Sequence, residues 1–250
     1  MKVTVATVCF NSEDTIEKTI ESVLEQTFEP IEYIIIDGHS SDSTVDKIEK
    51  YKKEHDIVLV SEQDKGLYDA MNKAAKLATG DYILYMNSGD VFADSDSVKK
   101  MAAYLDGGNE IVYGNVIRCK LAGEELERYH GKKIELRLLL QGKMMCHQSV
   151  FVRTDIMREY GFDLDYSITA DYDFIARTLH DGRKFRYVND ITVSKVDSIE
   201  GISSRVINMD AMREQDDRSL KQNFPIWYMI VTPPKAVIRY FRRIAEKRKI

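Results

Sequence analysis

Apolar residues come in blocks along the first third of the chain, and polar stretches separate them. Four apolar runs predict strands, at residues 2–10, 31–37, 57–61 and 82–87. The run 31–37 is nearly continuous, as expected for a strand buried on both faces. Between these runs, apolar residues recur at helical spacing and predict three helices, near residues 16–24, 45–55 and 67–79. Strands that alternate with helices predict a parallel sheet with right-handed crossovers. We therefore expect an α/β fold.

Composition narrows the class of protein. The chain has 250 residues, 44% of them hydrophobic and 31% charged, which suits a folded domain rather than a disordered one. Its net charge of −5 disfavours non-specific nucleic-acid binding, so we expect no nucleic-acid partner. The 3 cysteines are scattered and lack metal-binding spacing, which suggests reduced thiols. We find neither a signal peptide nor an apolar run of the ~18–20 residues that span a bilayer, and expect a cytoplasmic protein.

Polar side chains gather where the predicted strands end. The run 82–90 changes from apolar residues to Asn87, Ser88, Gly89 and Asp90, and the earlier strands end near Asn11, Asp37 and Asp64. In parallel sheets, ligands bind outside the carboxyl ends of the strands. Carboxylates on one edge repel each other unless a metal ion or hydrogen-bond donors use them. The pattern favours an enzyme site over a series of polar turns.

Two common nucleotide sites are absent from the sequence. No G-x-G-x-x-G follows the first strand, which argues against dinucleotide redox chemistry. No G-x-x-x-x-G-K-[ST] occurs, which argues against a P-loop NTPase.

Several motifs together carry a family resemblance. The segments TVCFN (7–11), IIIDGHSSDST (34–44), EQDKGLYDAMNKA (62–74), MNSGD (86–90), CHQ (146–148) and ADYD (170–173) resemble the family 2 glycosyltransferases of the GT-A fold. Bacterial enzymes that build exopolysaccharide, capsule or O-antigen are the most similar members. The resemblance implies a mostly parallel central sheet flanked by helices. It implies a catalytic domain at 1–205, with a nucleotide-sugar half (1–115) and an acceptor half (116–205), and a helical extension at 206–250.

The resemblance also implies roles at the nucleotide side. Asp37 matches the aspartate that reads the nucleobase, and Thr7 and Asn11 lie on the loop that lines the base and ribose. Asp64 and Gly66 match the segment that closes over the nucleotide. Asn87 stands within the family's Asp-x-Asp element, and the resemblance implies that it binds the nucleotide. Asp90 matches the last carboxylate of that element, which binds Mg²⁺ or Mn²⁺ on the donor diphosphate.

The acceptor side follows from the later motifs. Asp171 matches the catalytic base, and Asp173 is a rival that a two-residue offset on a helix would turn away. His147 and Gln148 match a segment on the acceptor or diphosphate side. The sequence departs from the family at Asn87 and Gly89, which often are aspartates, and at Ala170, which often is Glu, so only one firm carboxylate is left for a metal.

These roles imply an inverting transfer of one sugar from a nucleoside diphosphate sugar, with uridine diphosphate as the default, to an acceptor hydroxyl. The expected acceptor is a lipid-linked saccharide in cell-surface polysaccharide synthesis. The Gln-x-x-Arg-Trp signature of processive synthases is absent. Two alternatives stay open: a nucleotidyltransferase that forms sugar nucleotides, and a non-catalytic nucleotide-sugar-binding protein.

The C-terminal segment changes character. The apolar run FPIWYMIVT (224–232) precedes residues 235–250, which hold seven basic residues and one acidic residue, a net charge of +6. A basic tail beside Trp and Tyr favours docking on an anionic membrane, at the inner face of the cell membrane. The alternative is a helix packed on its own domain or on a second subunit of a homodimer.

Overall fold

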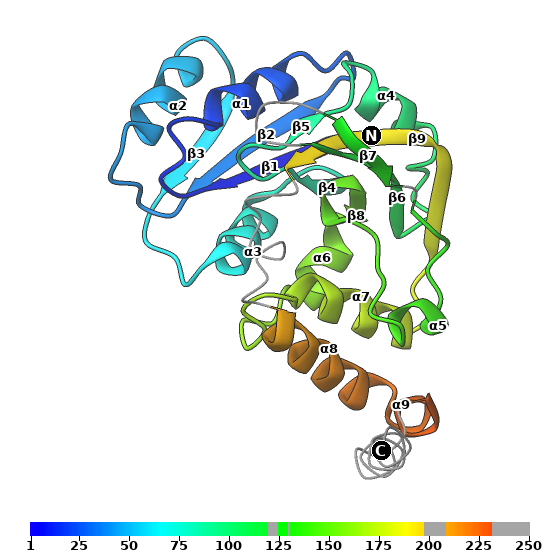
Figure 1. Cartoon of the computed structure of the whole chain (residues 1–250). Helices are drawn as coiled ribbons and strands as arrows, with labels where there is room; N and C mark the ends of the chain where they lie inside the picture. The colour runs from blue at the N-terminus through cyan, green and yellow to red at the C-terminus, as the bar shows by residue number, and fades with distance from the viewer. Residues whose placement is uncertain (120–124, 130, 198–208, 232–250) are drawn as a thin grey trace.

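The first half of the protein alternates strands and helices, as the sequence predicts. A computed structural model describes residues 1–119, 125–129, 131–197 and 209–231 (Figure 1). Its first elements are β1 (Val3–Cys9), α1 (Ile16–Leu24), β2 (Ile31–Asp37), α2 (Thr44–Lys52), β3 (Ile57–Ser61), α3 (Leu67–Leu77) and β4 (Tyr82–Tyr85).

These four strands form a parallel sheet in the order β3-β2-β1-β4. Every residue of β1 is buried, because helices cover the sheet on both faces. Apolar residues of α1 and α2 such as Ile16, Ile20 and Ile48 pack on one face. On the other face, the alanines of α3 allow that helix to lie close to the sheet, around the buried Met71. The predicted α/β architecture is confirmed.

The second half extends the same sheet with mixed pairing. Its elements are β5 (Val91–Phe92), α4 (Ser97–Ala102), β6 (Ile111–Cys119), β7 (Glu125–Tyr129), α5 (Leu136–Leu139), the 3₁₀ turn η1 (His147–Ser149), β8 (Val150–Arg153), α6 (Thr154–Tyr160), α7 (Ala170–His180) and β9 (Phe185–Asp197). In the described part of the chain, nine strands join one sheet, which continues from β4 through β8, β6, β9 and β5, with β7 on β6. The pairs β4–β8, β6–β8, β6–β7 and β5–β9 are antiparallel. The pair β6–β9 is parallel, so the sheet is parallel through its first four strands and mixed in the second half.

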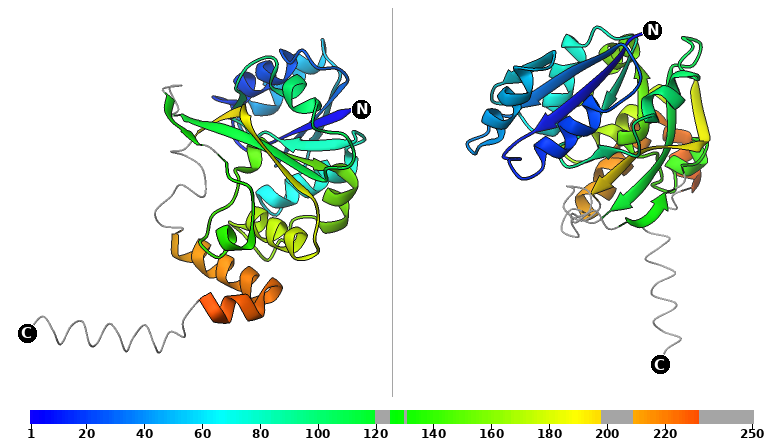
Figure 2. Two further views of the ribbon diagram at one scale, coloured as in Figure 1. Left: turned by 90° about the vertical axis from the view of Figure 1, so that its right-hand side faces the viewer. Right: turned by 90° about the horizontal axis from the view of Figure 1, so that it is seen from above.

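Two helices follow in the segment that the sequence assigns to an extension. Helix α8 (Met209–Asn223) lies along α7, and α9 (Pro225–Val231) turns away at the lower end of the molecule (Figure 2). Ser219 and Leu220 of α8 are buried against the body of the protein. Helix α8 thus packs on the predicted catalytic domain. The basic tail lies outside the described residues, which end at position 231.

None of the helices within the described ranges combines the length and the apolar character that a membrane span requires.

Candidate functional site

The carboxyl ends of the parallel strands meet at one edge of the sheet. Cys9 of β1 pairs with Asp37 of β2, which pairs with Ser61 of β3. The turn after β4 lies on the same edge, because its Ser88 N–H donates to the carbonyl of Val8 at 3.2 Å. The topology therefore brings the predicted strand-end residues together.

The carboxylate of Asp37 accepts hydrogen bonds from other residues of the protein. Its Oδ2 accepts hydrogen bonds from the backbone N–H of Ser40 at 3.0 Å and from the hydroxyl of Ser61 at 2.7 Å, and its Oδ1 accepts one from the Ser40 hydroxyl. The residue is 0% exposed. The carboxylate is thus fully engaged in the free protein, and its reading of the nucleobase stays a prediction. Asp37 fastens the loop after β2 to β3.

Thr7 also lies away from the expected ligand surface. It is fully buried, and its hydroxyl shares a hydrogen bond with that of Tyr33 at 3.1 Å within the core. Asn11 does lie at the edge: its N–H donates to Ser40 Oγ at 2.8 Å, and its Oδ1 accepts from the N–H of Ser41 at 2.9 Å. Of these two predicted residues, only Asn11 joins the strand-end loops.

Asp64 and Gly66 follow β3 at the same edge. Asp64 Oδ1 accepts the N–H of Gly66 at 2.8 Å. Gly66 has φ +113°, a conformation that favours glycine, and α3 starts at the next residue. Asp64 remains partly exposed. This short turn therefore leaves a carboxylate accessible beside the start of α3.

Asp90 is positioned by Gln148, a residue of the second half of the protein. It is 5% exposed, and its Oδ2 accepts a hydrogen bond from Gln148 Nε2 at 2.8 Å. The Cys146 thiol in turn donates to Gln148 Oε1 at 2.8 Å. Burial, with help from the charge of Asp90, raises the pKa of Cys146 to about 12, so the thiol keeps its proton and remains a donor. The predicted Gln148 therefore positions Asp90.

Asp171 lies between two proton donors. It is the second residue of α7, and its side chain is 20% exposed. Its Oδ2 is 3.3 Å from His147 Nδ1, and its Oδ1 is 3.1 Å from the hydroxyl of Tyr68. Burial and the charge of Asp171 raise the pKa of Tyr68 well above its usual range, so the phenol stays protonated. The structure thus groups Asp171 with His147, as the motifs imply, and adds Tyr68.

His147 links this carboxylate to the turn after β4. Its Nε2 is 3.1 Å from Asn87 Nδ2. An amide nitrogen only donates, so the ring accepts at Nε2 and carries its proton on Nδ1, toward Asp171. Asn87, His147 and Asp171 therefore form one hydrogen-bonded chain across the edge of the sheet.

Asp173 belongs to the core instead of the site. It is 2% exposed, pairs with Arg177 Nε at 2.6 Å and accepts a hydrogen bond from Ser219 of α8 at 2.7 Å. Two residues along a helix point in different directions, which separates it from Asp171. Its placement on the acceptor or diphosphate side is therefore corrected to a structural role that joins α7 to α8.

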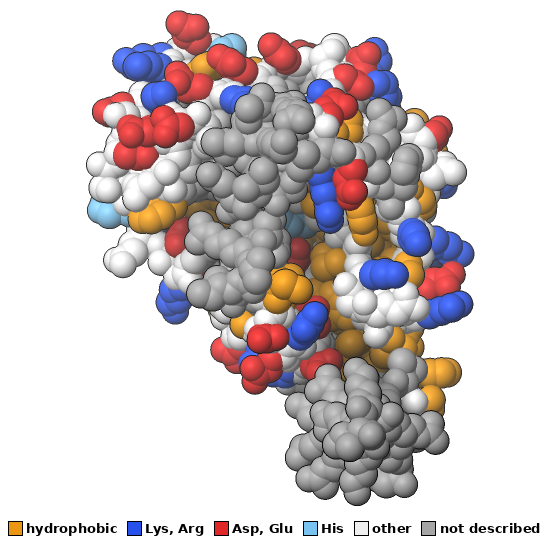
Figure 3. Space-filling view, in the orientation of Figure 1, with side chains coloured by type: hydrophobic (Ala, Val, Ile, Leu, Met, Phe, Trp, Pro, Cys, Tyr) orange, Lys and Arg blue, Asp and Glu red, His pale blue; other side chains and the backbone are white. Residues whose placement is uncertain are grey.

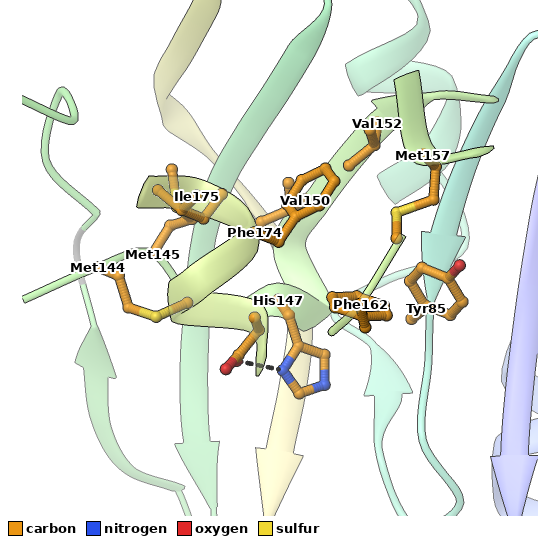
Figure 4. A pocket seen from close by; sticks show the side chains of 11 residues that line it. Tyr85, Met144, Met145, His147, Val150, Val152, Met157, Phe162, Phe174 and Ile175 are labelled. Carbon is orange, nitrogen blue, oxygen red and sulfur yellow. Dashed lines mark hydrogen bonds and ion pairs between the residues drawn. The ribbon is translucent and has the colours of Figure 1, made fainter. Parts of the chain in front are cut away.

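A small apolar cavity lies behind the Asp171–His147 pair (Figure 4). Its volume is about 20 Å³, room for one water-sized group. The remaining lining residues are Tyr85, Met144, Met145, Val150, Val152, Met157, Phe162, Phe174 and Ile175. The pair thus separates the polar edge of the sheet from the core of the second half.

One positioning residue could not be found from the sequence. Gln215 of α8 accepts hydrogen bonds at its Oε1 from the N–H groups of Ile168 at 3.0 Å and Thr169 at 3.2 Å. These residues come directly before α7, so Gln215 holds the helix start that carries Asp171. No motif marks it, because the contact depends on how α8 docks.

The edge of the sheet offers few side chains that could coordinate a metal ion. The residues that the structure describes include no group of three His, Cys, Asp or Glu side chains arranged to hold a metal. Asp90 and Asn87 lie in one turn, and the buried Oδ1 of Asn87 has no hydrogen-bond partner among the described residues. Two oxygen ligands of this kind fit a hard divalent ion whose shell is completed by phosphate oxygens.

Comparison with known proteins identifies the family. The model of glycosyl transferase family 2 matches residues 4–164. A PGL/p-HBAD biosynthesis glycosyltransferase of Mycobacterium bovis is 26% identical over 199 residues, which cover 78% of this chain and 76% of the relative.

Solved structures show the same fold. Residues 1–349 of S. aureus TarS in complex with UDP-GlcNAc match with a TM-score of 0.72 and 20% identity, over 90% of this chain and 68% of TarS 1–349. The mannosyltransferase PcManGT from Pyrobaculum calidifontis in complex with GDP-Man and Mn²⁺ matches with a TM-score of 0.63 and 18% identity, over 89% and 63%.

Proposed function

The chain belongs to glycosyl transferase family 2, and we propose that it transfers one sugar from a nucleoside diphosphate sugar to an acceptor hydroxyl with inversion. The observation that carries this proposal is the environment of Asp171. Its carboxylate is partly exposed, is oriented by His147 and Tyr68, and within the described ranges pairs with no Lys or Arg. A positioned carboxylate without a cationic partner suits a general base.

The reaction then follows from the position of this base. Asp171 takes the proton of the acceptor hydroxyl while the acceptor oxygen forms a bond to the anomeric carbon. The bond between that carbon and the diphosphate oxygen breaks, and the nucleoside diphosphate leaves with the electron pair. Attack from the side opposite the leaving group inverts the anomeric configuration. The Nδ1–H of His147 keeps the carboxylate oriented during the transfer.

Mg²⁺ or Mn²⁺ is the proposed cofactor. Asp90 and the free amide oxygen of Asn87 would hold it, with the donor diphosphate supplying further oxygens. The ion supplies charge neutralisation on the departing diphosphate. The Mn²⁺ in the mannosyltransferase structure supports this choice. A single protein carboxylate implies weak metal binding in the absence of nucleotide.

The donor site is proposed along the edge formed by Asn11, Asp64, Gly66 and Asn87. Asp37 supports this edge, because its hydrogen bonds with Ser40 and Ser61 hold the loop after β2 against β3. Uridine diphosphate is the proposed nucleotide, and the UDP-GlcNAc complex of TarS supports this choice. Guanosine diphosphate is the alternative, which the GDP-Man complex of PcManGT supports. All of these residues come from the nucleotide-sugar half, while Asp171 comes from the acceptor half.

The proposed acceptor is a lipid-linked saccharide of cell-surface polysaccharide synthesis, met at the inner face of the cell membrane. Helix α9 supports this location, because four of its large apolar side chains are exposed: Ile226 66%, Trp227 54%, Met229 68% and Ile230 67%. Apolar side chains are visible there at the lower right of the molecule (Figure 3). The basic residues at 235–250 follow directly in sequence, a combination that suits an anionic lipid surface.

A screen with nucleotide sugars tests this function. Thermal unfolding of the full chain is measured with UDP-, GDP- and dTDP-sugars, with and without Mn²⁺, followed by release of nucleoside diphosphate with water or added glycosides as acceptors. We expect one donor to stabilise the fold and to be turned over, and NMR of the product to show inversion. Pyrophosphate release from a nucleoside triphosphate and a sugar phosphate would favour the nucleotidyltransferase alternative, and binding without turnover would favour the non-catalytic one.

A further inference from the structure

The α5 segment, residues 131–145, is basic although the chain as a whole is acidic. It holds four basic residues and one acidic residue, a net charge of +3, whereas the whole chain carries −5. All four basic side chains are exposed: Lys132, Lys133, Arg137 and Lys143. In the described part of the chain none of them pairs with a carboxylate, and Lys143 Nζ donates to Gln141 Oε1 at 3.3 Å. Their charge is therefore available to an anionic partner outside the protein.

The same segment presents apolar side chains beside these charges. Ile134, Leu139 and Met145 are buried in the core, and the Tyr113 hydroxyl donates to the carbonyl of Lys132 at 2.7 Å, so the backbone of the segment is fixed. Four apolar side chains of the segment stay partly exposed: Leu136, Leu138, Leu140 and Met144. The α5 segment thus combines unpaired cations with apolar side chains on one ordered surface.

Helix α9 lies at the same end of the molecule as α5 (Figures 1 and 2). Lys and Arg side chains gather at the right of the molecule near α5, above the apolar side chains at the lower right (Figure 3). Apolar side chains beside Lys and Arg suit the boundary of an anionic bilayer, because the apolar groups enter the lipid while the cations meet its phosphates. A second copy of the chain fits less well, since an isologous contact would bring +3 against +3.

We propose that the α5 segment docks on an anionic membrane together with α9 and brings the catalytic pair to the lipid surface. This inference rests on the proposed function and names the surface through which the enzyme meets its lipid-linked acceptor. Met144 and His147 line the same cavity behind the Asp171–His147 pair, and three residues of chain span at most about 11 Å. The catalytic pair therefore lies close to the level of the headgroups, where the saccharide of a lipid-linked acceptor is found.

Co-sedimentation of the full chain with vesicles of phosphatidylglycerol and phosphatidylcholine, and of phosphatidylcholine alone, tests the proposal. Each cation near an anionic surface contributes about fivefold in affinity, so Arg137→Gln with Lys143→Gln should weaken binding to the anionic vesicles about tenfold or more. The matched control, Lys50→Gln with Lys53→Gln, removes the same charge from exposed positions of α2 and its C-terminal end. It should change the affinity by less than about threefold, because charges beyond a Debye length of the lipid are screened.

Hydrogen exchange of the full chain maps the contact without relying on affinity. Anionic vesicles should slow amide exchange in both the α5 segment and residues 225–231, and should leave α2 unchanged. The Arg137→Gln and Lys143→Gln double variant should lose the slower exchange in the α5 segment first, because its charges act there.

Four outcomes overturn the proposal. They are no binding to anionic vesicles, slower exchange confined to α9, equal effects of the two double variants on affinity, and slower exchange of the α5 segment that appears with rising protein concentration alone. The last of these would assign the surface to a second copy of the chain. Failure of the transfer function is detected separately, because release of nucleoside diphosphate with soluble glycosides as acceptors requires no lipid. A chain that transfers sugar but docks through α9 alone contradicts only the role of the α5 segment.

Discussion

Replacement of the proposed base separates chemistry from binding. In Asp171→Asn the amide oxygen can still accept the Nδ1–H of His147, and the Tyr68 hydroxyl keeps its hydrogen bond to the carbonyl of Ile168 at 2.7 Å. The backbone N–H of Tyr172 donates to Asp171 Oδ1 at 2.9 Å and meets the new NH₂ group when the amide oxygen faces His147, so we expect the free energy of unfolding to fall by about 1 kcal/mol. The amide cannot take a proton at neutral pH, so only the catalytic step should suffer.

The expected loss is large enough to measure directly. A positioned general base contributes about 10²–10⁴-fold, which corresponds to ~3–5 kcal/mol of activation free energy. Turnover is followed as release of nucleoside diphosphate at saturating donor, and donor affinity by calorimetry. We expect kcat for Asp171→Asn to fall by at least ~10²-fold while the donor Kd stays within about threefold.

Asp173→Asn is the matched control on the same helix. It removes a carboxylate that pairs with Arg177 in the interior, so it should lower stability by ~3 kcal/mol and leave turnover of the folded protein near normal. If donor affinity fell as far as turnover in Asp171→Asn, or if Asp173→Asn removed turnover from folded protein, the assignment of the base would be refuted.

Three further predictions follow from other residues. Asp90→Asn should weaken Mn²⁺-dependent binding of nucleoside diphosphate and reduce turnover at least ~10-fold, measured by titration with and without the metal; normal turnover at saturating donor would contradict its role. Burial raises the pKa of Asp216 from 3.8 to about 6, so the fold disfavours the ionised form and loses stability as the pH rises through about 6. Asp216→Asn should therefore raise Tm by a few degrees at pH 8 and by progressively less toward pH 4, as measured by thermal unfolding across this pH range. The control Asp210→Asn, at an exposed site of the same helix, should leave Tm unchanged at both pH values. Trp227→Ser with Ile230→Ser should reduce co-sedimentation with anionic vesicles about tenfold or more, because two apolar side chains no longer enter the lipid; binding unchanged by the double variant would indicate that α9 faces protein.

The nucleotide half of the fold could be predicted because each of its strands is marked by an apolar run in the sequence. The run at 31–37 matches β2 residue for residue, since a strand buried on both faces is almost continuously apolar, and the run at 57–61 matches β3, a partly exposed edge strand. Helix α8 could not be placed in the same way. Its sequence, MDAMREQDDRSLKQN, has no apolar stripe, and it docks mainly through polar contacts such as Ser219 with Asp173. Such contacts depend on the partner surface and leave no periodic pattern in the sequence.

The direction of individual side chains limited prediction of the site in a similar way. The family resemblance implies one region for Asp171, His147 and Gln148, and the structure brings Asp171 and His147 together, with Gln148 in the same turn on Asp90. Thr7 was placed at the edge although it points into the core toward Tyr33, because a strand buried on both faces gives no alternation from which to read direction.

Burial, more than position at the end of a strand, separates the acids that serve the structure from those that face a ligand. Asp37 and Asp173 are 0% and 2% exposed, and each has several donors, as a buried carboxylate requires. Asp64 and Asp171 are partly exposed, and each keeps capacity to accept another hydrogen bond. Asp90 lies between these groups: it is 5% exposed, yet it shares a turn with the unpartnered amide oxygen of Asn87. A bound cation would satisfy this amide oxygen and contact the Asp90 carboxylate, so the step from free to donor-bound enzyme should centre on this turn.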